Sequence, residues 1–276
     1  MILDYIVWTF DPVAFSLFGL EVRWYGVIFA SIFGVGLYIL GKMFKHEGLN
    51  DNSLADSIFW YVALGVFIGA RLGHCFFYEP YYYLTHPLEI LAVRDGGLAS
   101  HGAAVCVPIA LWILSRKKKI SFWYIVDRVV VILAFGAVFI RTGNLFNSEI
   151  YGHPTTLPWG FIFANNGETL PKHPTQIYES LSYLILFITL FTYFWRKKGK
   201  IANGMLLGYF LIGCFGARFF IEFLKENQEG IDQHLKVLDM GQLLSIPLII
   251  AGIVVLFLAR KKKFGVGASS KTIAVK

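Results

Sequence analysis

Long apolar runs, separated by short polar or basic connections, dominate the chain. A helix needs about 20 apolar residues to cross a bilayer, and seven runs approach or reach that length. We predict membrane-spanning helices over residues 24–41, 54–73, 102–115, 122–141, 179–195, 204–224 and 241–259. The expected fold is an all-α polytopic membrane protein, with residues 1–263 as one seven-span domain and 264–276 as a flexible tail.

The composition agrees with a membrane protein and excludes other classes. Of the 276 residues, 56% are hydrophobic and 16% are charged, whereas a soluble domain carries about 25% charged residues. Such a chain is neither a soluble globular enzyme nor a disordered protein. The three cysteines are dispersed in apolar contexts without a CxxC pattern, so we expect neither a disulfide framework nor a metal site.

Basic residues predict the orientation of the chain. Four Lys and Arg residues follow each of the third, fifth and seventh spans, at 116–119, 196–200 and 260–263, and Lys42 and Lys45 follow the first. Because short basic loops mark the cytoplasm, we predict an outer N-terminus and a cytoplasmic tail. Basic blocks also occur in nucleic-acid-binding proteins, but here each block ends an apolar run, so we expect no nucleic-acid partner.

The segments between spans on the predicted outer side have features of their own. Residues 1–23 lack the basic start of a cleavable signal peptide and are interpreted as an interfacial segment. The Asn165-Asn-Gly167 turn predicts a small hairpin within 152–174. An aromatic cluster over 76–83 suits the head-group level. The third span, at 14 residues or about 21 Å, is short, which favours re-entrant entry of 95–101.

Ionisable and polar side chains inside spans are functional candidates by default. These candidates fall in the predicted outer half of the membrane and are Tyr25, Arg71, His101, Arg141, Arg218 and Glu222. Simpler roles exist for several of them. Arg71 is suited to snorkelling at a helix end, Tyr25 to an interfacial anchor, and Arg218 with Glu222 to a structural i,i+4 pair.

A dense polar run follows the fourth span. Arg141, Asn144 and Asn147 recur at i,i+3 and would lie along one side of a helix. One cation and two amides in a stripe suit a phosphate and neighbouring hydroxyls, and Glu149 is placed to hold Arg141 or a hydroxyl. The residues alone therefore predict an anion site in the outer leaflet, with His101 nearby.

Five ordered motifs resemble the signatures of the prolipoprotein diacylglyceryl transferase family. They are Arg23-Trp-Tyr-Gly26, Asp95-Gly-Gly-Leu-Ala-Ser-His-Gly102, the run 141–152, His173-Pro-Thr-Gln-Ile-Tyr-Glu179 and Gly216-Ala-Arg-Phe-Phe-Ile-Glu222. The chain departs from the family pattern at Ile140, Ala103 and Leu145. It also has Cys214 where the family often has a tyrosine.

The resemblance implies a bacterial inner-membrane enzyme with its active site toward the outer leaflet. Such enzymes transfer the diacylglyceryl group of phosphatidylglycerol to the lipobox cysteine of a prolipoprotein signal peptide. A thioether forms and glycerol phosphate leaves. The implied partners are these two substrates and membrane lipid, and no cofactor or metal is expected.

The resemblance also implies roles for individual residues. His101 would be the general base, and Arg141 and Arg218 would bind the phosphate. An alternative stays open, in which Arg218 rather than His101 lowers the pKa of the thiol. The remaining implied substrate-site residues orient the head group, support Arg218, wall the site or allow close backbone approach; they are Tyr25, Arg71, Gly97, Gly102, Asn144, Asn147, Glu149, Gly152 and Glu222.

Three other functions fit part of the pattern. A transporter or flippase for an anionic lipid or small anion needs a polar route through both leaflets, yet the inner halves of the spans are largely apolar. A scaffold would explain the glycines and aromatics but not deep arginines and a histidine in one layer. A seven-span receptor rests on span count alone, which is weak evidence for function.

Overall fold

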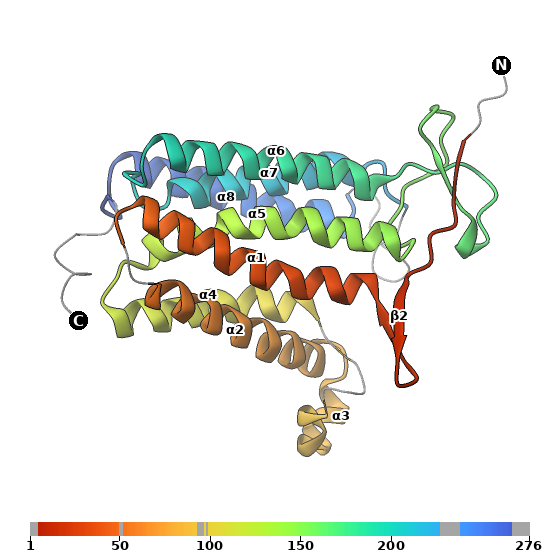
Figure 1. Ribbon diagram of the computed structural model, residues 1–276, viewed down its shortest axis with the longest axis horizontal. Helices are drawn as coiled ribbons and strands as arrows, with labels where there is room; N and C mark the ends of the chain where they lie inside the picture. Colours follow the sequence, from red (N-terminus) through yellow and green to blue (C-terminus); the bar gives the residue numbers. More distant parts are fainter. Residues whose placement is uncertain (1–4, 50–51, 93–96, 98, 227–237, 267–276) are drawn as a thin grey trace.

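The protein is a bundle of long, roughly aligned helices with small β elements at one end (Figure 1). The computed structural model describes residues 5–49, 52–92, 97, 99–226 and 238–266. Its long helices are α1 (Trp24–His46), α2 (Ser53–Phe77), α4 (Ser100–Lys118), α5 (Phe122–Phe146), α6 (Thr175–Arg196), α7 (Met205–Glu222) and α8 (Met240–Arg260). Helix α5 lies in the middle of the bundle and is the most buried span.

The helices match the predicted apolar runs, but most extend beyond them. Among the described residues, six helices are long and apolar enough to cross a membrane, namely α1, α2, α5, α6, α7 and α8. This confirms a polytopic membrane protein. Helix α4 has 19 residues and so exceeds the predicted run. At the usual helical rise it is about 28 Å long. Of the segment 95–101, expected to be re-entrant, residues 95, 96 and 98 lie outside the described residues, and 100 and 101 already belong to α4.

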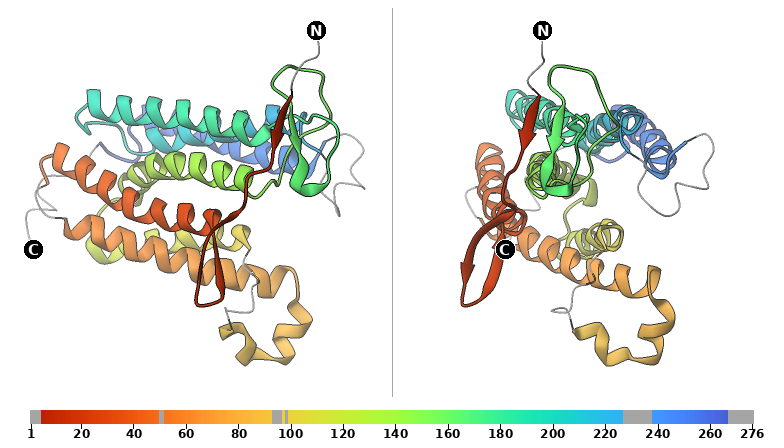
Figure 2. Two further views of the ribbon diagram at one scale, coloured as in Figure 1. Left: turned by 45° about the vertical axis from the view of Figure 1, so that its right-hand side comes forward. Right: turned by 90° about the vertical axis from the view of Figure 1, so that its right-hand side faces the viewer.

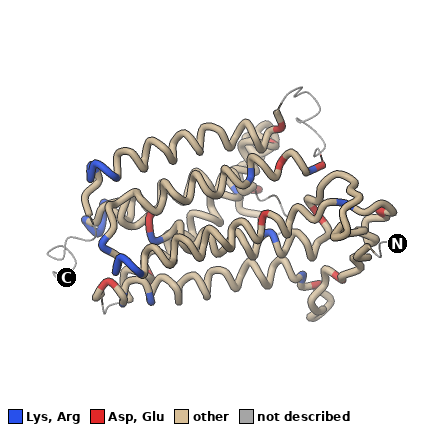
Figure 3. The backbone as a smooth tube through the Cα atoms, turned by 90° about the horizontal axis from the view of Figure 1, so that it is seen from above, with Lys and Arg blue, Asp and Glu red and all other residues tan. Residues whose placement is uncertain are grey.

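The two ends of the bundle differ in charge. Lys and Arg gather where α4, α6 and α8 end, as Figure 3 shows. We call this the basic end. At the opposite end, α1 begins beside β2, α5 ends and α6 begins (Figure 1). We call this the site end, because the candidate residues lie here.

The β elements lie at the site end and differ from the predicted ones. Strands β2 (Val13–Leu17) and β3 (Leu20–Arg23) form an antiparallel hairpin within the segment interpreted as interfacial. Strand β1 (Ile6–Trp8) pairs in parallel with β4 (Phe161–Phe163). The predicted hairpin around residues 165–167 is reduced to an antiparallel bridge between Phe161 and Lys172. Strand β4 instead pairs along its whole length with the distant β1.

A short arm continues from α2 at the same end. Helix α3 (Pro80–Thr85) and the 3-10 helix η1 (Pro87–Leu91) project from the bundle (Figure 2). The arm exposes Tyr81, Leu84, Leu88 and Leu91, each at least 70% accessible. Its position at the head-group level, expected for the aromatic cluster over 76–83, stays a prediction.

Glycines allow α2 and α4 to pack backbone to backbone. A Cβ atom added to Gly102 would lie 1.9 Å from the carbonyl oxygen of Gly69 and 2.7 Å from the Cα of Gly73. At Gly65 an added Cβ would lie 3.2 Å from the Cα of Val107, a tight but less severe contact. These distances leave no room for a side chain, so Gly102 serves helix packing and does not line an open substrate surface.

Replacing Gly102 with alanine should therefore destabilise the protein. The obstacle is rigid backbone, so we expect the overpacking cost of about 1–3 kcal/mol, seen as a melting temperature lower by several degrees in detergent. The matched control is Gly34→Ala on α1, where an added Cβ meets nothing within 4 Å and helix propensity favours alanine. Equal melting temperatures for the two variants would contradict this close packing.

Buried charges near the basic end are structural. The Asp127 carboxylate caps the start of α7 by accepting hydrogen bonds from the backbone N–H groups of Gly204 (2.8 Å) and Leu207 (2.9 Å). The fully buried Arg128 forms an ion pair with Glu47, and its guanidinium lies 3.6 Å from the centre of the Tyr124 ring. This cluster joins α5 to the end of α1.

Candidate functional site

The polar run after the fourth span leaves the helix earlier than its periodicity predicts. Helix α5 ends at Phe146, and Asn147 caps it. The next residues turn sharply, because Ser148 and Ile150 both have left-handed backbone angles, with φ of 55° and 60°. Such angles are unusual for a β-branched side chain, and strained backbone of this kind clusters at functional sites. The turn directs the Glu149 side chain back toward α5.

Glu149 is held by two amides. Its Oε1 atom accepts hydrogen bonds from the Nδ2 atoms of Asn144 (2.7 Å) and Asn147 (3.3 Å). The other end of the Asn144 amide accepts a hydrogen bond from the Arg141 guanidinium at 3.1 Å. The structure therefore brings Glu149 together with the three residues of the predicted stripe, although Glu149 reaches Arg141 through Asn144 and not directly.

Two side chains from the start of α6 fix the strained turn. The Thr175 hydroxyl donates to the backbone carbonyl of Ile150 (2.8 Å), and Gln176 Nε2 donates to that of Glu149 (2.7 Å). Both side chains are almost fully buried, at 0% and 1% exposed. The conformation that presents Glu149 thus depends on α6.

A chain of buried charges anchors Arg141. The Nε atom of Arg141 lies 2.9 Å from a carboxylate oxygen of Glu179, which is fully buried on α6. The other oxygen of Glu179 accepts hydrogen bonds from Lys225 Nζ (3.2 Å) and the Tyr183 hydroxyl (3.3 Å). Lys225 also pairs with Glu222 at 2.9 Å. Three elements, α5, α6 and the end of α7, are therefore joined through Glu179.

This chain corrects the predicted role of Glu222. Glu222 does not pair with Arg218 but with Lys225, and its carboxylate packs over Gly241 of α8, where an added Cβ would lie 2.1 Å from a carboxylate oxygen. No described carboxylate forms an ion pair with Arg218. The Arg218 guanidinium instead interacts electrostatically with Tyr183 and Cys214. Arg141 interacts electrostatically with the same two side chains. The two arginines thus share neighbours.

Tyr25 joins the same group from α1. Its ring packs on Gly143 of α5, where an added Cβ would lie 2.7 Å from a ring carbon. A side chain at position 143 would push the ring away, so Gly143 is the residue that lets Tyr25 approach the polar turn. The role of Tyr25 as a wall of the site stays a prediction.

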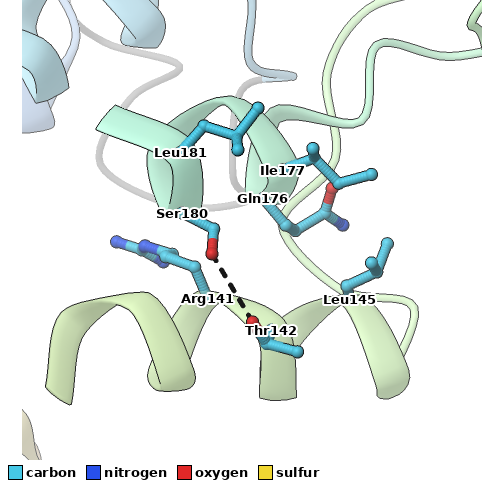
Figure 4. Close-up of a pocket in the computed structure, with 7 residues that line it drawn as sticks. All are labelled: Arg141, Thr142, Leu145, Gln176, Ile177, Ser180 and Leu181. Atoms are coloured by element: carbon cyan, nitrogen blue, oxygen red, sulfur yellow. Dashed lines mark hydrogen bonds between the residues drawn. The ribbon is translucent and has the colours of Figure 1, made fainter. Parts of the chain in front are cut away.

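A pocket of about 200 Å³ opens between α5 and α6 beside Arg141. Its lining combines polar and apolar side chains, which Figure 4 shows: Arg141, Thr142, Leu145, Gln176, Ile177, Ser180 and Leu181. The Thr142 and Ser180 hydroxyls lie 3.5 Å apart and both donate to the Val138 carbonyl. A cation beside an apolar wall suits the polar head and the chains of a lipid.

The remaining predicted residues form a second group at the ends of α2 and α4. Arg71 donates hydrogen bonds to the backbone carbonyls of Ile90 (2.8 Å), Glu89 (2.6 Å) and Gly97 (3.3 Å), and so holds the arm rather than snorkelling. Gly97 has φ of 76°, and an added Cβ would lie 2.4 Å from the His74 ring. Arg71 and Gly97 therefore stabilise local structure.

His101 belongs to this second group by position. It is the second residue of α4 and is exposed. Within the described ranges, no hydrogen bond, ion pair or ring contact joins its imidazole to Arg141, Arg218 or any other residue. The structure therefore does not bring the three predicted catalytic side chains into contact with one another.

Gly152 lies where the outer loop meets the end of α7. It forms an antiparallel bridge with Lys225, and an added Cβ would lie 2.1 Å from the carbonyl oxygen of Leu224. The close backbone approach expected at Gly152 is therefore an approach to another segment of the protein itself. In the adjoining loop, burial lowers the pKa of Lys172, but hydrogen bonds to Glu226 and Glu168 outweigh it and leave that pKa raised. The loop is thus fastened to the chain after α7.

Sequence reasoning left four residues of this site without a role: Gly143, Gln176, Glu179 and Lys225. Glu179 had a usable signal, because a carboxylate inside an apolar stretch needs a partner. No local sequence signal indicated the pairing of Lys225 with Glu179, since 46 residues separate the two.

The chain is similar over nearly its whole length to proteins of one known family. The family model described as prolipoprotein diacylglyceryl transferase matches residues 12–258. A phosphatidylglycerol–prolipoprotein diacylglyceryl transferase of Chloroherpeton thalassium is 45% identical over 94% of this chain and 96% of the relative. Proteins of the same name from Porphyromonas gingivalis and Tolumonas auensis are 45% and 39% identical, over 90% and 94% of this chain and 93% and 99% of their own lengths.

The match spans all seven long helices almost to the end of α8, and it includes both groups of candidate residues. Identity of this level over nearly the whole of both chains places them in one family. This chain belongs to the prolipoprotein diacylglyceryl transferase family.

Proposed function

We propose that this chain transfers the diacylglyceryl group of phosphatidylglycerol to the lipobox cysteine of prolipoproteins. Membership of the family supports this activity, and the strongest observation of the structure is the pair of cations at the site end. Arg141 is fixed by Glu179 and Asn144, while Arg218 forms no ion pair with a described carboxylate. Neither the family match nor these residues favour the transporter.

The reaction is an alkyl transfer. The cysteine thiol gives its proton to a base, and the sulfur attacks the glycerol carbon of the diacylglyceryl group. A C–S bond forms while the C–O bond to the phosphate breaks, and glycerol phosphate leaves with the electron pair. Arg141 and Arg218 stabilise the negative charge that gathers on the leaving phosphate. Asn144, Asn147 and Glu149 orient the head group, and Tyr25 walls the site.

We propose that all seven long helices cross the bacterial inner membrane, with the site end toward the outer leaflet. The concentration of Lys and Arg at the opposite end (Figure 3) favours a cytoplasmic position for that end. Helix α4 is about 28 Å long, which nearly matches a hydrocarbon core of about 30 Å. An odd number of crossings also agrees with α1 beginning at one end of the bundle and α8 ending at the other.

The test of this function is direct. The purified protein is placed in phosphatidylglycerol bilayers with a peptide that carries an apolar stretch and a lipobox cysteine. We expect the mass of the peptide to rise by one diacylglyceryl unit, and a cysteine-to-serine peptide to stay unchanged. Absence of a mass gain, together with protein-dependent passage of phosphate or labelled lipid across the bilayer, would favour the transporter.

We also propose that His101 takes the thiol proton. His101→Gln should then slow transfer at neutral pH by about 10²–10⁴-fold, the usual contribution of a general base. The deficit should shrink near pH 9.5, because a thiol with a reference pKa of about 8.5 ionises there unaided. The matched control is His74→Gln, since His74 packs on Gly97 in the same group without a catalytic assignment.

The alternative assigns activation of the thiol to Arg218. In that case His101→Gln keeps its rate at neutral pH, and Arg218→Met is the variant whose deficit shrinks as the pH rises. Comparing the two pH profiles of kcat/KM therefore separates the two assignments.

A further inference from the structure

Gln176, which lines the Arg141 pocket, carries a buried polar atom without a hydrogen-bond partner, and two more such atoms belong to the turn that Gln176 holds. Among the described residues, Asn147 Oδ1, Ser148 Oγ and Gln176 Oε1 are shielded from solvent and receive no hydrogen bond. A buried acceptor without a donor destabilises the folded protein. An unexplained group of them near a pocket calls for a ligand that supplies donors.

The orientation of the Gln176 amide is fixed by its neighbours. Its Nε2 atom donates to the backbone carbonyl of Glu149 at 2.7 Å, and a carbonyl can only accept. The Oε1 atom therefore occupies the other position of the amide. Asn147 is constrained in the same way, because its Nδ2 donates to the Glu149 carboxylate and leaves Oδ1 as an acceptor.

Gln176 also shares the pocket with Arg141. Both line the same space of about 200 Å³, from facing helices α6 and α5 (Figure 4). A ligand that fits both needs a negative group for the guanidinium and a donor close to that group for the amide oxygen. A phosphate ester of a polyol has this combination, whereas an ammonium-bearing head group would place its positive charge beside Arg141.

We propose that Gln176 determines head-group specificity by accepting a hydrogen bond from a hydroxyl of the terminal glycerol of the lipid. This inference rests on the proposed function and adds to it the selection of a hydroxylated head group. Gln176 binds the substrate while its Nε2 positions Glu149.

The test compares two lipids that differ only in hydroxyl groups. Phosphatidylglycerol and phosphatidylpropanol with the same acyl chains carry the same single negative charge, and the second has no free hydroxyl. We expect the wild-type protein to prefer phosphatidylglycerol in kcat/KM by about 10- to 100-fold, as expected when a buried acceptor loses its donor. In Gln176→Leu the preference should fall toward one.

Thr175→Val is the matched control. It removes the neighbouring hydrogen bond to the same strained turn without removing a proposed head-group acceptor. It should slow transfer from both lipids by the same factor and keep the preference. Equal use of the two lipids by the wild-type protein, or a full preference in Gln176→Leu, would overturn the inference.

A binding measurement separates this inference from the proposed reaction. Calorimetry in bilayers compares glycerol phosphate with propyl phosphate and needs no turnover and no variant. Tighter binding of glycerol phosphate supports the subsite even when transfer is absent, and equal affinities refute it. Absence of transfer from either lipid by the wild-type protein, with tighter glycerol phosphate binding, would refute the proposed reaction alone.

Discussion

Arg141→Met should lower kcat/KM for diacylglyceryl transfer by about 10²–10³-fold, which is the usual effect of removing one preorganised donor from a developing negative charge. The loss should persist at a pH where the thiol is already ionised, because Arg141 is assigned to the phosphate and not to the thiol. The measurement is the transfer rate to a lipobox peptide across a pH series.

The structure separates this effect from unfolding. When Arg141 is removed, Glu179 keeps Lys225 and Tyr183 as partners, so the buried carboxylate is still compensated. The melting temperature should therefore fall much less than the activity. Arg141→Lys, which keeps the charge but loses the planar fork, should lie between wild type and Arg141→Met. A near-normal rate for Arg141→Met with ionised thiol would refute the phosphate assignment.

The largest expected change in stability comes from the opposite end of the molecule. Arg128→Met leaves the Glu47 carboxylate without its cation and Tyr124 without its stacked guanidinium. Breaking one side of a buried ion pair costs about 3–5 kcal/mol. We expect a strongly lowered melting temperature in detergent, with the transfer rate per folded molecule unchanged, because this cluster is far along the bundle from Arg141.

The control for this variant is the double change Glu47→Gln with Arg128→Met. The neutral amide no longer needs a cation, so the double variant should be more stable than Arg128→Met alone. The Tyr124 hydroxyl, which donates to Glu47 at 2.7 Å, can still donate to the amide oxygen. Additive effects of the two single changes would show that the ion pair is not coupled.

The helices could be predicted from the sequence because each depends on a local pattern. The apolar runs placed all seven, and errors arose mainly at their ends. Helix α1 continues to His46, five residues past the apolar run, because backbone hydrogen bonding tolerates polar side chains beyond the hydrocarbon core. Periodicity placed Arg141 and Asn144 correctly but could not show that the chain leaves the helix after Phe146.

Long-range pairings were beyond local reasoning. Glu222 has a cation four residues before it, Arg218, and another three residues after it, Lys225, and helical spacing allows either pair. The structure pairs it with Lys225, because Lys225 also meets Glu179 on a separate helix. The β2–β3 hairpin escaped prediction for a related reason. Its turn has Phe18 at φ of 51° before Gly19, whereas the usual signal is Asn-Gly.

The strained turn at Ser148 and Ile150 also bears on the order in which the protein is made. The ribosome synthesises α5 and Arg141 before α6. Thr175 and Gln176, which hold the turn, lie about 25 residues after the turn residues that they bind. Until α6 has inserted and docked, Glu149 has no fixed position and Arg141 has no carboxylate to anchor it. We therefore expect a nascent chain that stops before α6 to lack the fixed arrangement of Arg141 and Glu149 on which transfer depends.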